Sequence, residues 1–169
     1  MEAQSTGPKA LRISVFSSEP SERVVDSDGV KQRLNHGAHG DSEKMNLLEE
    51  QLTEQIIGSA IEVHRFWGPG LYEEIYERSL CRELEMRGLA FERQRTLPLL
   101  YKGTKVGDNL TLDVCVEKTV VVENKHVKEL LPIHRAQLMT YLKLTGCRVG
   151  LLINYNVPVL KDGIKRIVL

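Results

Sequence analysis

Two apolar segments that almost adjoin constrain the fold more than any other feature of this sequence. Residues 110–116 read LTLDVCV, and residues 119–125 read TVVVENK. Successive side chains of a β-strand point to opposite faces, so each segment can place apolar residues on one face. The two segments predict an antiparallel hairpin, and its apolar faces coincide only with a three-residue loop, 117–119. Such loops usually hold Gly at a left-handed position, and this one has none.

This register specifies which side chains meet across the hairpin. It pairs Val116 with Val120 and Val114 with Val122. It also places Asp113 opposite Glu123, and Thr111 opposite Lys125. By alternation, Leu112 should share the apolar face of Val114, whereas Asp113 shares the other face with Thr111 and Cys115. The expected result is a pair of carboxylates with an ammonium group beside them.

Two carboxylates that face each other across a strand pair repel, and partial burial increases the cost. A divalent cation between Asp113 and Glu123 would relieve it, and a few oxygen ligands with open positions suit magnesium. Lys125 could then orient the attacking water or stabilise charge on a phosphoryl oxygen. The alternative is a surface Asp113 with a solvated Glu123–Lys125 ion pair. The run Val120–Val122 before Glu123 indicates a buried central strand and favours the metal site.

The segment after the hairpin predicts a helix that Pro132 opens and Gly146 closes. His134, Gln137 and Tyr141 are spaced i, i+3, i+7 and form one polar-edged stripe. His134 could instead be an exposed polar residue of the first turn, and Gln137 a surface amide. Tyr141 fits a core position with its hydroxyl at the rim. The side chains expected to pack on another side of the helix are Ile133, Ala136 and Leu144.

Two helices are predicted before the strands. The first begins at Asn46, which forms a capping-box pattern with Glu49, and it ends at Trp67 before Gly68-Pro69-Gly70. The second runs from about Tyr72 to Arg87 and buries Tyr76, Leu80 and Leu84. Glu73 lies three residues before Tyr76, so it points along the buried stripe. A carboxylate in the first turn can also simply favour the helix dipole.

The other predicted strands are residues 91–101, 105–116, 148–154 and 164–169, with a turn at Lys102-Gly103. The order is therefore helix, helix, three strands, helix, strand, strand. This order predicts an α/β domain over residues 46–169, with a central mixed β-sheet flanked by helices.

Residues 1–45 are rich in Ser and Gly and keep no helical or strand period. They predict a disordered N-terminal extension, which is either functional or an upstream extension of the reading frame. The H-x-x-H pair His36 and His39 lies in it, where a metal site is the less favoured interpretation.

Composition excludes some classes of protein. Lys plus Arg and Asp plus Glu are 23 each, so the chain has no positive excess for a sequence-independent nucleic-acid coat. No run of apolar residues is long enough for a transmembrane helix, and no signal peptide is recognisable. The three cysteines predict neither a disulfide framework nor a C-x-x-C metal clip. We therefore expect a cytoplasmic protein without a membrane partner.

At these residues the sequence resembles the GxxExxY proteins of the PD-(D/E)XK nuclease superfamily. The resemblance rests on Gly70, Glu73 and Tyr76 in GPGLYEEIY, on LDVCVEKTVVVENK, and on HRAQLMTYLKLTGCRVGLLINY. It covers residues 46–169 and implies a restriction-endonuclease-like core of helix, three strands, helix and strand.

The resemblance also implies roles for the site residues. Asp113 and Glu123 would bind Mg²⁺, or Mn²⁺, with the main-chain carbonyl of Asn124, and Lys125 would position or activate water. Glu73 would hold a second metal or the metal's water shell. Gln137 would orient Lys125 or a phosphate. His134 and Tyr141 match family positions of unsettled role. Asn124 replaces a usually apolar residue, and its side chain should face away from the site.

The implied activity is magnesium-dependent hydrolysis of phosphodiester bonds in nucleic acid, with DNA as the expected substrate. One alternative is a non-catalytic nucleic-acid- or protein-binding module on a nuclease scaffold. Another is a nuclease that works only as a homodimer or with a partner subunit.

Overall fold

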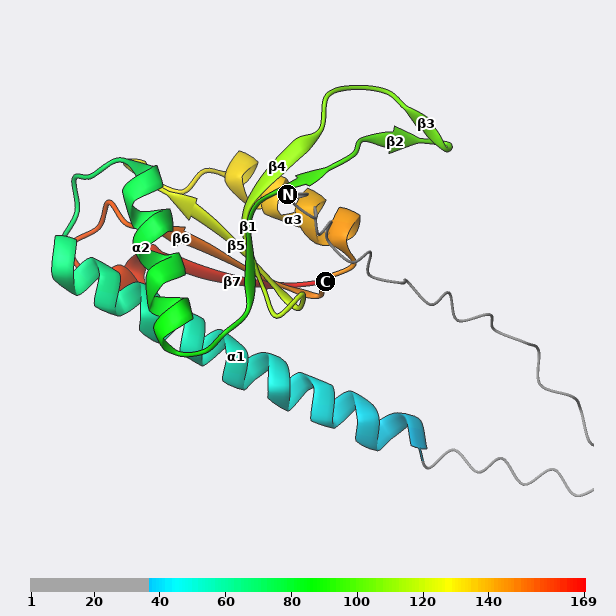
Figure 1. The fold of residues 1–169 in the computed structure, drawn as a ribbon, viewed down its shortest axis with the longest axis horizontal. Coiled ribbons are helices and arrows are strands. Elements are labelled where there is room, and N and C mark those ends of the chain that lie inside the picture. The colour runs from blue at the N-terminus through cyan, green and yellow to red at the C-terminus, as the bar shows by residue number, and fades with distance from the viewer. Residues whose placement is uncertain (1–36) are drawn as a thin grey trace, which may run out of the picture. The chain divides into compact units, whose positions relative to one another are not determined.

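The computed structural model describes residues 37–169, which form a mixed five-stranded sheet with helices on both faces (Figure 1). The sheet order is β1-β4-β5-β6-β7, and β5 and β6 are parallel. The helices are α1 (Gly37–Trp67), α2 (Glu73–Met86) and α3 (Pro132–Thr145), with a short 3-10 helix η1 (Leu160–Gly163). The strands of this sheet are β1 (Phe91–Leu97), β4 (Leu110–Val116), β5 (Val120–Lys125), β6 (Val149–Asn154) and β7 (Ile164–Val168). The predicted α/β class is confirmed, and the strands of this sheet follow the predicted order. The predicted strand 105–116 is shorter, because β4 begins only at Leu110.

Helix α1 begins at Gly37, so the predicted start at Asn46 is wrong. Asn46 lies inside the helix, and residues 42–48 are exposed. Figure 1 shows this part of α1 running out past the sheet. Adding turns to an existing helix avoids the cost of nucleation, which explains helical structure without tertiary contacts. Of the predicted disordered extension, residues 1–36 lie outside the described residues, as does the side chain of His39.

The other helix boundaries follow their sequence signals. Helix α1 ends at Trp67, and α3 begins at Pro132, as predicted. Gly146 ends α3 with a left-handed φ of 76°, and its N–H donates to the carbonyl of Leu142. A residue without Cβ adopts this conformation without strain.

The first long strand predicted, residues 91–101, is interrupted. Pro98 has no N–H to donate to a ladder, and β1 ends at Leu97. The chain then leaves the sheet as a separate two-stranded arm, β2 (Leu100–Tyr101) and β3 (Thr104–Lys105), before β4 begins. The predicted turn at Lys102-Gly103 joins these two strands, and both residues have positive φ. The arm projects beyond the sheet in Figure 1.

The β4–β5 register is the predicted one, because Val116 pairs with Val120 and Val114 with Val122. Glu117 and Lys118 of the loop take left-handed φ values of 50° and 54° without being Gly. Glu117 is held there by two hydrogen bonds with Ala90. Its N–H donates to the Ala90 carbonyl, and its carboxylate accepts the Ala90 N–H. These bonds offset the strain of the conformation.

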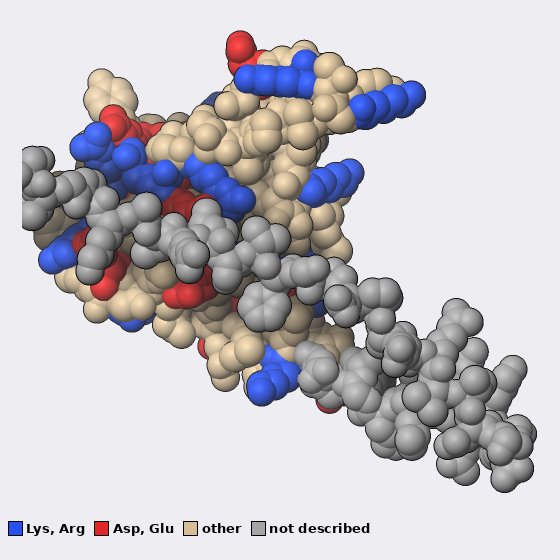
Figure 2. All heavy atoms as spheres, turned by 45° about the vertical axis from the view of Figure 1, so that its right-hand side comes forward, with Lys and Arg blue, Asp and Glu red and all other residues tan. Residues whose placement is uncertain are grey.

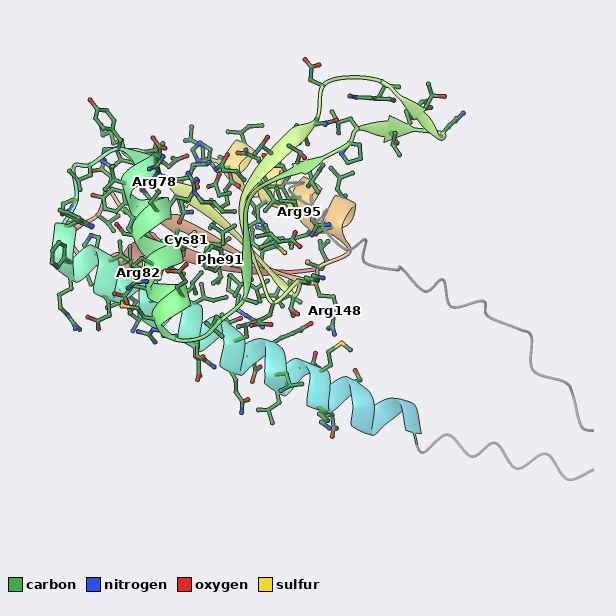
Figure 3. The ribbon with its side chains drawn as sticks, viewed as in Figure 1. Arg78, Cys81, Arg82, Phe91, Arg95 and Arg148 are labelled. Carbon is green, nitrogen blue, oxygen red and sulfur yellow. The ribbon has the colours of Figure 1, made fainter. Side chains whose placement is uncertain are left out.

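The sheet separates two hydrophobic cores. One lies under α1 and α2 and includes Val114, Val122 and Tyr76; Cys81 of α2 and Phe91 of β1 pack there too (Figure 3). The other lies under α3 and includes Leu112, Val121, Leu138 and Leu152. Leu112 and Val114 therefore face opposite cores, and the prediction that they share one face is wrong. The reversal falls at Asp113, where the β1–β4 pairing skips Gln94 and Asp113 and Gln94 has a left-handed φ of 51°.

Helix α3 buries Leu138, Tyr141 and Leu142. The expected packing of Ile133, Ala136 and Leu144 is wrong, because these three side chains are exposed, Ile133 to 65%. Within residues 37–169, no helix has the length and apolar character needed to cross a membrane.

Candidate active site

Strands β4 and β5 separate at one end, and the candidate site lies where they do. In the described residues their pairing stops at Val114–Val122. Asp113 does not continue the ladder; its carboxylate accepts the main-chain N–H of Asn124 at 2.8 Å. The predicted ladder pairs, Asp113 with Glu123 and Thr111 with Lys125, are therefore not formed. The carboxylate of Asp113 is instead fixed at the open end of the hairpin.

Glu123 and Lys125 form an ion pair on β5. The Glu123 side chain is buried, with the residue only 1% exposed, and its Oε1 accepts from Lys125 Nζ at 2.6 Å. Glu123 Oε2 is buried and has no hydrogen-bond partner. A solvated surface pair, the alternative considered from the sequence, does not describe this buried arrangement. The free oxygen leaves Glu123 with an unused acceptor in a desolvated position.

The electrostatics of the site favour a bound cation. Burial, and then repulsion from Asp113, raises the pKa of Glu123 to about 7. Burial raises the pKa of Asp113 to about 6, although the Asn124 N–H and Lys125 oppose the shift. Burial alone would lower the pKa of Lys125, but the hydrogen bond and charge of Glu123 outweigh it and raise that pKa. Lys125 is therefore an ammonium group at neutral pH and acts as a donor rather than a base.

Glu73 joins this group from the first turn of α2. Its Oε1 lies 3.7 Å from Lys125 Nζ, and its Oε2 accepts the main-chain N–H of His126 at 3.2 Å. Glu73 is partly exposed. The prediction that it points toward the buried stripe agrees with these contacts, which a carboxylate serving only the helix dipole would not require.

Gly70 and Tyr76 fix the loop that leads to Glu73. The Tyr76 hydroxyl donates to the carbonyl of Gly68 at 2.6 Å and accepts the N–H of Leu71 at 3.1 Å. Its ring is fully buried and stacks on Tyr155, with centroids 4.4 Å apart. Gly70 has φ 111°, a conformation that side chains with a Cβ rarely adopt. The G-x-x-E-x-x-Y spacing thus places Gly70 in the loop, Glu73 at the start of α2 and the buried Tyr76, which holds the loop, within seven residues.

Replacing Tyr76 with Phe should destabilise the fold by about 1–3 kcal/mol, because it leaves the Gly68 carbonyl and the Leu71 N–H without partners. Thermal unfolding measures this. The matched control is Tyr72→Phe, since the Tyr72 side chain is 83% exposed and its loss of a hydroxyl should not change the melting temperature. Equal melting temperatures for Tyr76→Phe and the wild type would contradict the anchoring role.

The polar stripe of α3 lies beside the site without touching Lys125. Gln137 donates its amide to the Tyr141 hydroxyl at 2.9 Å, and that hydroxyl donates to the Thr111 carbonyl at 3.0 Å. Tyr141 is buried, as expected of a core residue with its hydroxyl at the rim. His134 accepts the Leu131 N–H at its Nδ1 and so serves the start of α3. The structure brings together Asp113, Glu123, Lys125 and Glu73, but not His134.

Glu77, which was not predicted as a site residue, is buried on α2 one turn after Glu73. It forms an ion pair with Arg93 and accepts the side-chain amide of Gln94 at 2.6 Å. Its charge is among those that raise the pKa of Asp113. A hollow of about 390 Å³ lies here, with side chains on its wall from α2, β1 and β4: Glu73, Glu74, Glu77, Arg93, Gln94 and Asp113. The spacing of Glu77 from Glu73 and Leu80, i+4 and i−3, was the available signal.

The donor set fits a divalent cation of the hard, oxygen-binding kind. Asp113 and Glu123 offer carboxylate oxygens, one of them buried without a partner, and Asn124, the residue after Glu123, adds a main-chain carbonyl. Within residues 37–169, no three His, Cys, Asp or Glu side chains converge as a ready-made metal cluster. Two carboxylates with one carbonyl leave most positions to water and substrate, which is typical of Mg²⁺ rather than of a closed structural site.

The Asn124 side chain lies on the opposite side of β5 from Glu123, as expected. Asn124 pairs with Ile153, which belongs to the core under α1 and α2. Its amide nitrogen and oxygen are both buried without hydrogen-bond partners. Each such group costs about 1–3 kcal/mol, so an apolar residue would suit the fold better.

A comparison with protein families matches residues 50–167 to the PD-(D/E)XK nuclease superfamily. The matched range holds every element that forms the site. The chain belongs to the PD-(D/E)XK nuclease superfamily. The match confirms the resemblance inferred from the sequence and the restriction-endonuclease-like fold, while the narrower GxxExxY grouping stays a prediction. Searches of curated proteins and of solved structures found no match.

The three residues that the sequence resemblance assigns to the signature, Asp113, Glu123 and Lys125, lie on the neighbouring strands β4 and β5 within the matched range. Nucleases of this superfamily typically use divalent metal ions. The site described above has the residue types that this chemistry needs, at the open end of β4 and β5.

Proposed function

We propose that this protein is a magnesium-dependent nuclease that hydrolyses phosphodiester bonds in DNA. The observation that carries the proposal is the buried Glu123. One of its oxygens accepts from Lys125, the other has no partner, and the charge of Asp113 helps to raise its pKa. A purely structural ion pair does not need a second acid whose charge raises the pKa of the first. A site for a cation and a phosphate does.

The proposed roles follow from the contacts. Asp113, Glu123 and the carbonyl of Asn124 would hold Mg²⁺, or Mn²⁺ in its place, which supplies Lewis-acid polarisation of the phosphodiester and acidifies water. Lys125 donates to the phosphoryl oxygen on which negative charge develops. Glu73, whose carboxylate lies 3.7 Å from Lys125 Nζ, would orient Lys125 through this ion pair or hold the water shell of the cation. Gln137, whose amide donates to the Tyr141 hydroxyl, would orient a phosphate from the neighbouring helix α3.

The protonation state of Lys125 supports its role as a hydrogen-bond donor. Its pKa is raised by the carboxylates around it, so it stays charged throughout the neutral range. An ammonium group that is already hydrogen-bonded to Glu123 is held in one orientation before substrate binds. Such preorganisation is what makes a charged donor effective in a transition state.

The experiment that tests the proposal is an assay of the purified full chain on labelled oligonucleotides. Single- and double-stranded DNA and RNA are each incubated with Mg²⁺, with Mn²⁺ and with excess EDTA. We expect cleavage of DNA with either ion and none with EDTA. The proposal is overturned if no substrate is cut while nucleic acid or another protein is still bound, because that result identifies a non-catalytic binding module. Cleavage only at high protein concentration, with a matching shift on a sizing column, identifies an active dimer.

A further inference from the structure

A second hollow lies on the α3 face of the sheet, away from the acidic one. It has a volume of about 370 Å³ and is formed by the loop before α3, the start of α3 and strands β6 and β7. Its floor includes Leu152 and Ile167, and its charged residues are Arg135, Lys165 and Arg166. No carboxylate lines it, in contrast to the four that line the hollow beside Asp113.

The arginines of this hollow differ from most arginines of residues 37–169, which lie close to a glutamate. The chain has no net charge, and Figure 2 shows acidic and basic side chains intermixed on the face that it draws. Figure 3 shows four of the arginines that lie within 4.0 Å of a glutamate. In the part of the chain that the structure describes, such arginines are Arg65, Arg78, Arg82, Arg93, Arg95 and Arg148. Among residues 37–169, no acidic side chain lies within that distance of Arg135, Lys165 or Arg166.

The sheet register connects this hollow to the candidate active site. Glu123 of β5 pairs with Leu152 of β6, and Leu152 pairs with Lys165 of β7. Paired residues point to the same face, so Glu123 and Lys165 stand in one row on the α3 side. Arg166 pairs with Leu151 of the other core, so it lines the hollow from the edge strand β7 and not from this row. Neighbouring strands lie about 4.8 Å apart, which puts the two backbones roughly 10 Å from each other. A stacked nucleic-acid strand advances about 3.4 Å per nucleotide, so this distance corresponds to roughly three nucleotides.

We propose that the hollow around Arg135, Lys165 and Arg166 binds the phosphate groups of the nucleic-acid strand on one side of the bond that is cut. The inference rests on the proposed function, since it names the surface along which the substrate of that site runs. Unpaired cations are required here because the neutral chain attracts a polyanion only through a local group of positive charges. Arginine can hold a phosphate through two N–H donors at once, and the apolar floor can pack against sugars.

The test removes the three charges without reversing them. The full-length triple variant Arg135→Gln, Lys165→Gln, Arg166→Gln is compared with the wild type for binding of a fluorescent 20-nucleotide DNA. Calcium replaces magnesium so that the DNA is bound but not cut. We expect affinity to fall by about 10- to 100-fold at low salt. The slope of log affinity against log salt should also become shallower by about 2 for a single strand, because each phosphate contact contributes about 0.7.

The control is the double variant Lys143→Gln, Lys161→Gln, which also removes exposed lysines. Lys143 lies on α3 beyond the hollow, and Lys161 lines a different hollow with residues of α1. Its affinity and salt slope should match the wild type. The variant Arg135→Lys, Arg166→Lys keeps the charges and should retain most of the binding. Melting temperatures confirm that all variants are folded.

Two outcomes overturn the inference. One is an unchanged affinity and salt slope in the triple variant. The other is that the wild type binds poly-glutamate as tightly as DNA and the triple variant does not bind poly-glutamate. That result identifies a surface for acidic proteins. Hydrolysis of bis(p-nitrophenyl) phosphate by the wild type with Mg²⁺ tests the proposed function separately, since this substrate has no neighbouring nucleotides. Hydrolysis with unchanged DNA binding in the triple variant refutes the inference alone; no hydrolysis with the expected loss of binding refutes the nuclease activity alone.

Discussion

Replacing Lys125 with Ala should lower the rate of magnesium-dependent DNA cleavage by about 10²- to 10⁴-fold, while the protein remains folded. Lys125 contacts both Glu123 and Glu73, at 2.6 and 3.7 Å, and no other Lys or Arg of residues 37–169 does so. Without it, no ammonium group faces the charge that develops on the phosphoryl oxygen. Single-turnover cleavage of saturating DNA measures the effect on the chemical step.

The matched control is Lys128→Ala. Lys128 lies three residues further along the same chain segment, and no glutamate or aspartate among the described residues lies within 4.0 Å of its ammonium group. Because this charge is exposed, its loss should change the single-turnover rate by less than about threefold. Undiminished cleavage by Lys125→Ala would end the proposed mechanism. A loss of equal size in both variants would also refute a specific role for Lys125.

Lys125→Ala should also change the stability of the fold, which is measured independently of cleavage. Removing Lys125 leaves Glu123 buried without its cation, so the cost of ionising Glu123 rises. The melting temperature of Lys125→Ala should therefore fall most at alkaline pH and recover at pH 5, where Glu123 is protonated. This pH dependence distinguishes a lost ion pair from general misfolding.

The β4–β5 hairpin shows how much of the fold can be predicted from local sequence patterns. Its register was predictable because the apolar residues of both segments have only one parity in which they face the same core. Glu123 and Lys125 followed, since residues i and i+2 of one strand must share a face. Glu73 followed from its helical spacing to Tyr76, and Pro132 and Gly146 marked the ends of α3.

The position of Asp113 shows what local patterns could not give. Alternation placed it directly across from Glu123, but β4 reverses its faces at this residue. The reversal depends on the left-handed backbone of Gln94 in the neighbouring strand and on the hydrogen bond to Asn124. Both features involve segments other than β4 itself. Neither Gln94 nor Asn124 is a residue type from which such a role can be predicted. The ion pair between buried Glu77 and exposed Arg93 escaped prediction for the same reason.

Replacing Asp113 with Asn should stabilise the metal-free protein at neutral and alkaline pH while it lowers DNA cleavage by at least about 10²-fold. The pKa of Asp113 is raised from 3.8 to about 6 in the folded protein, first of all by burial. The folded state therefore favours the protonated acid. Its contribution to stability is fully present below pH 3.8 and is lost as pH rises through 6.

Asparagine keeps an oxygen that can accept the Asn124 N–H, but it carries no charge at any pH. The variant should thus match the wild type near pH 4 and exceed it above pH 7 by on the order of 1–3 kcal/mol. Thermal unfolding in EDTA across this range measures the difference. Asp108→Asn, which neutralises an exposed carboxylate outside the site, should change neither stability nor cleavage.

Divalent metal should reverse the order of the two proteins. Mg²⁺ or Mn²⁺ binds the folded wild type and raises its melting temperature at pH 8, because a ligand of the folded state stabilises it by mass action. Asp113→Asn lacks one of the two carboxylates and should show little or no increase. A variant that is less stable than the wild type in EDTA at pH 8, or that gains as much from Mn²⁺, would show that Asp113 is a structural residue. The expected pattern instead identifies Asp113 as a residue that lowers the stability of the fold in exchange for a cation site.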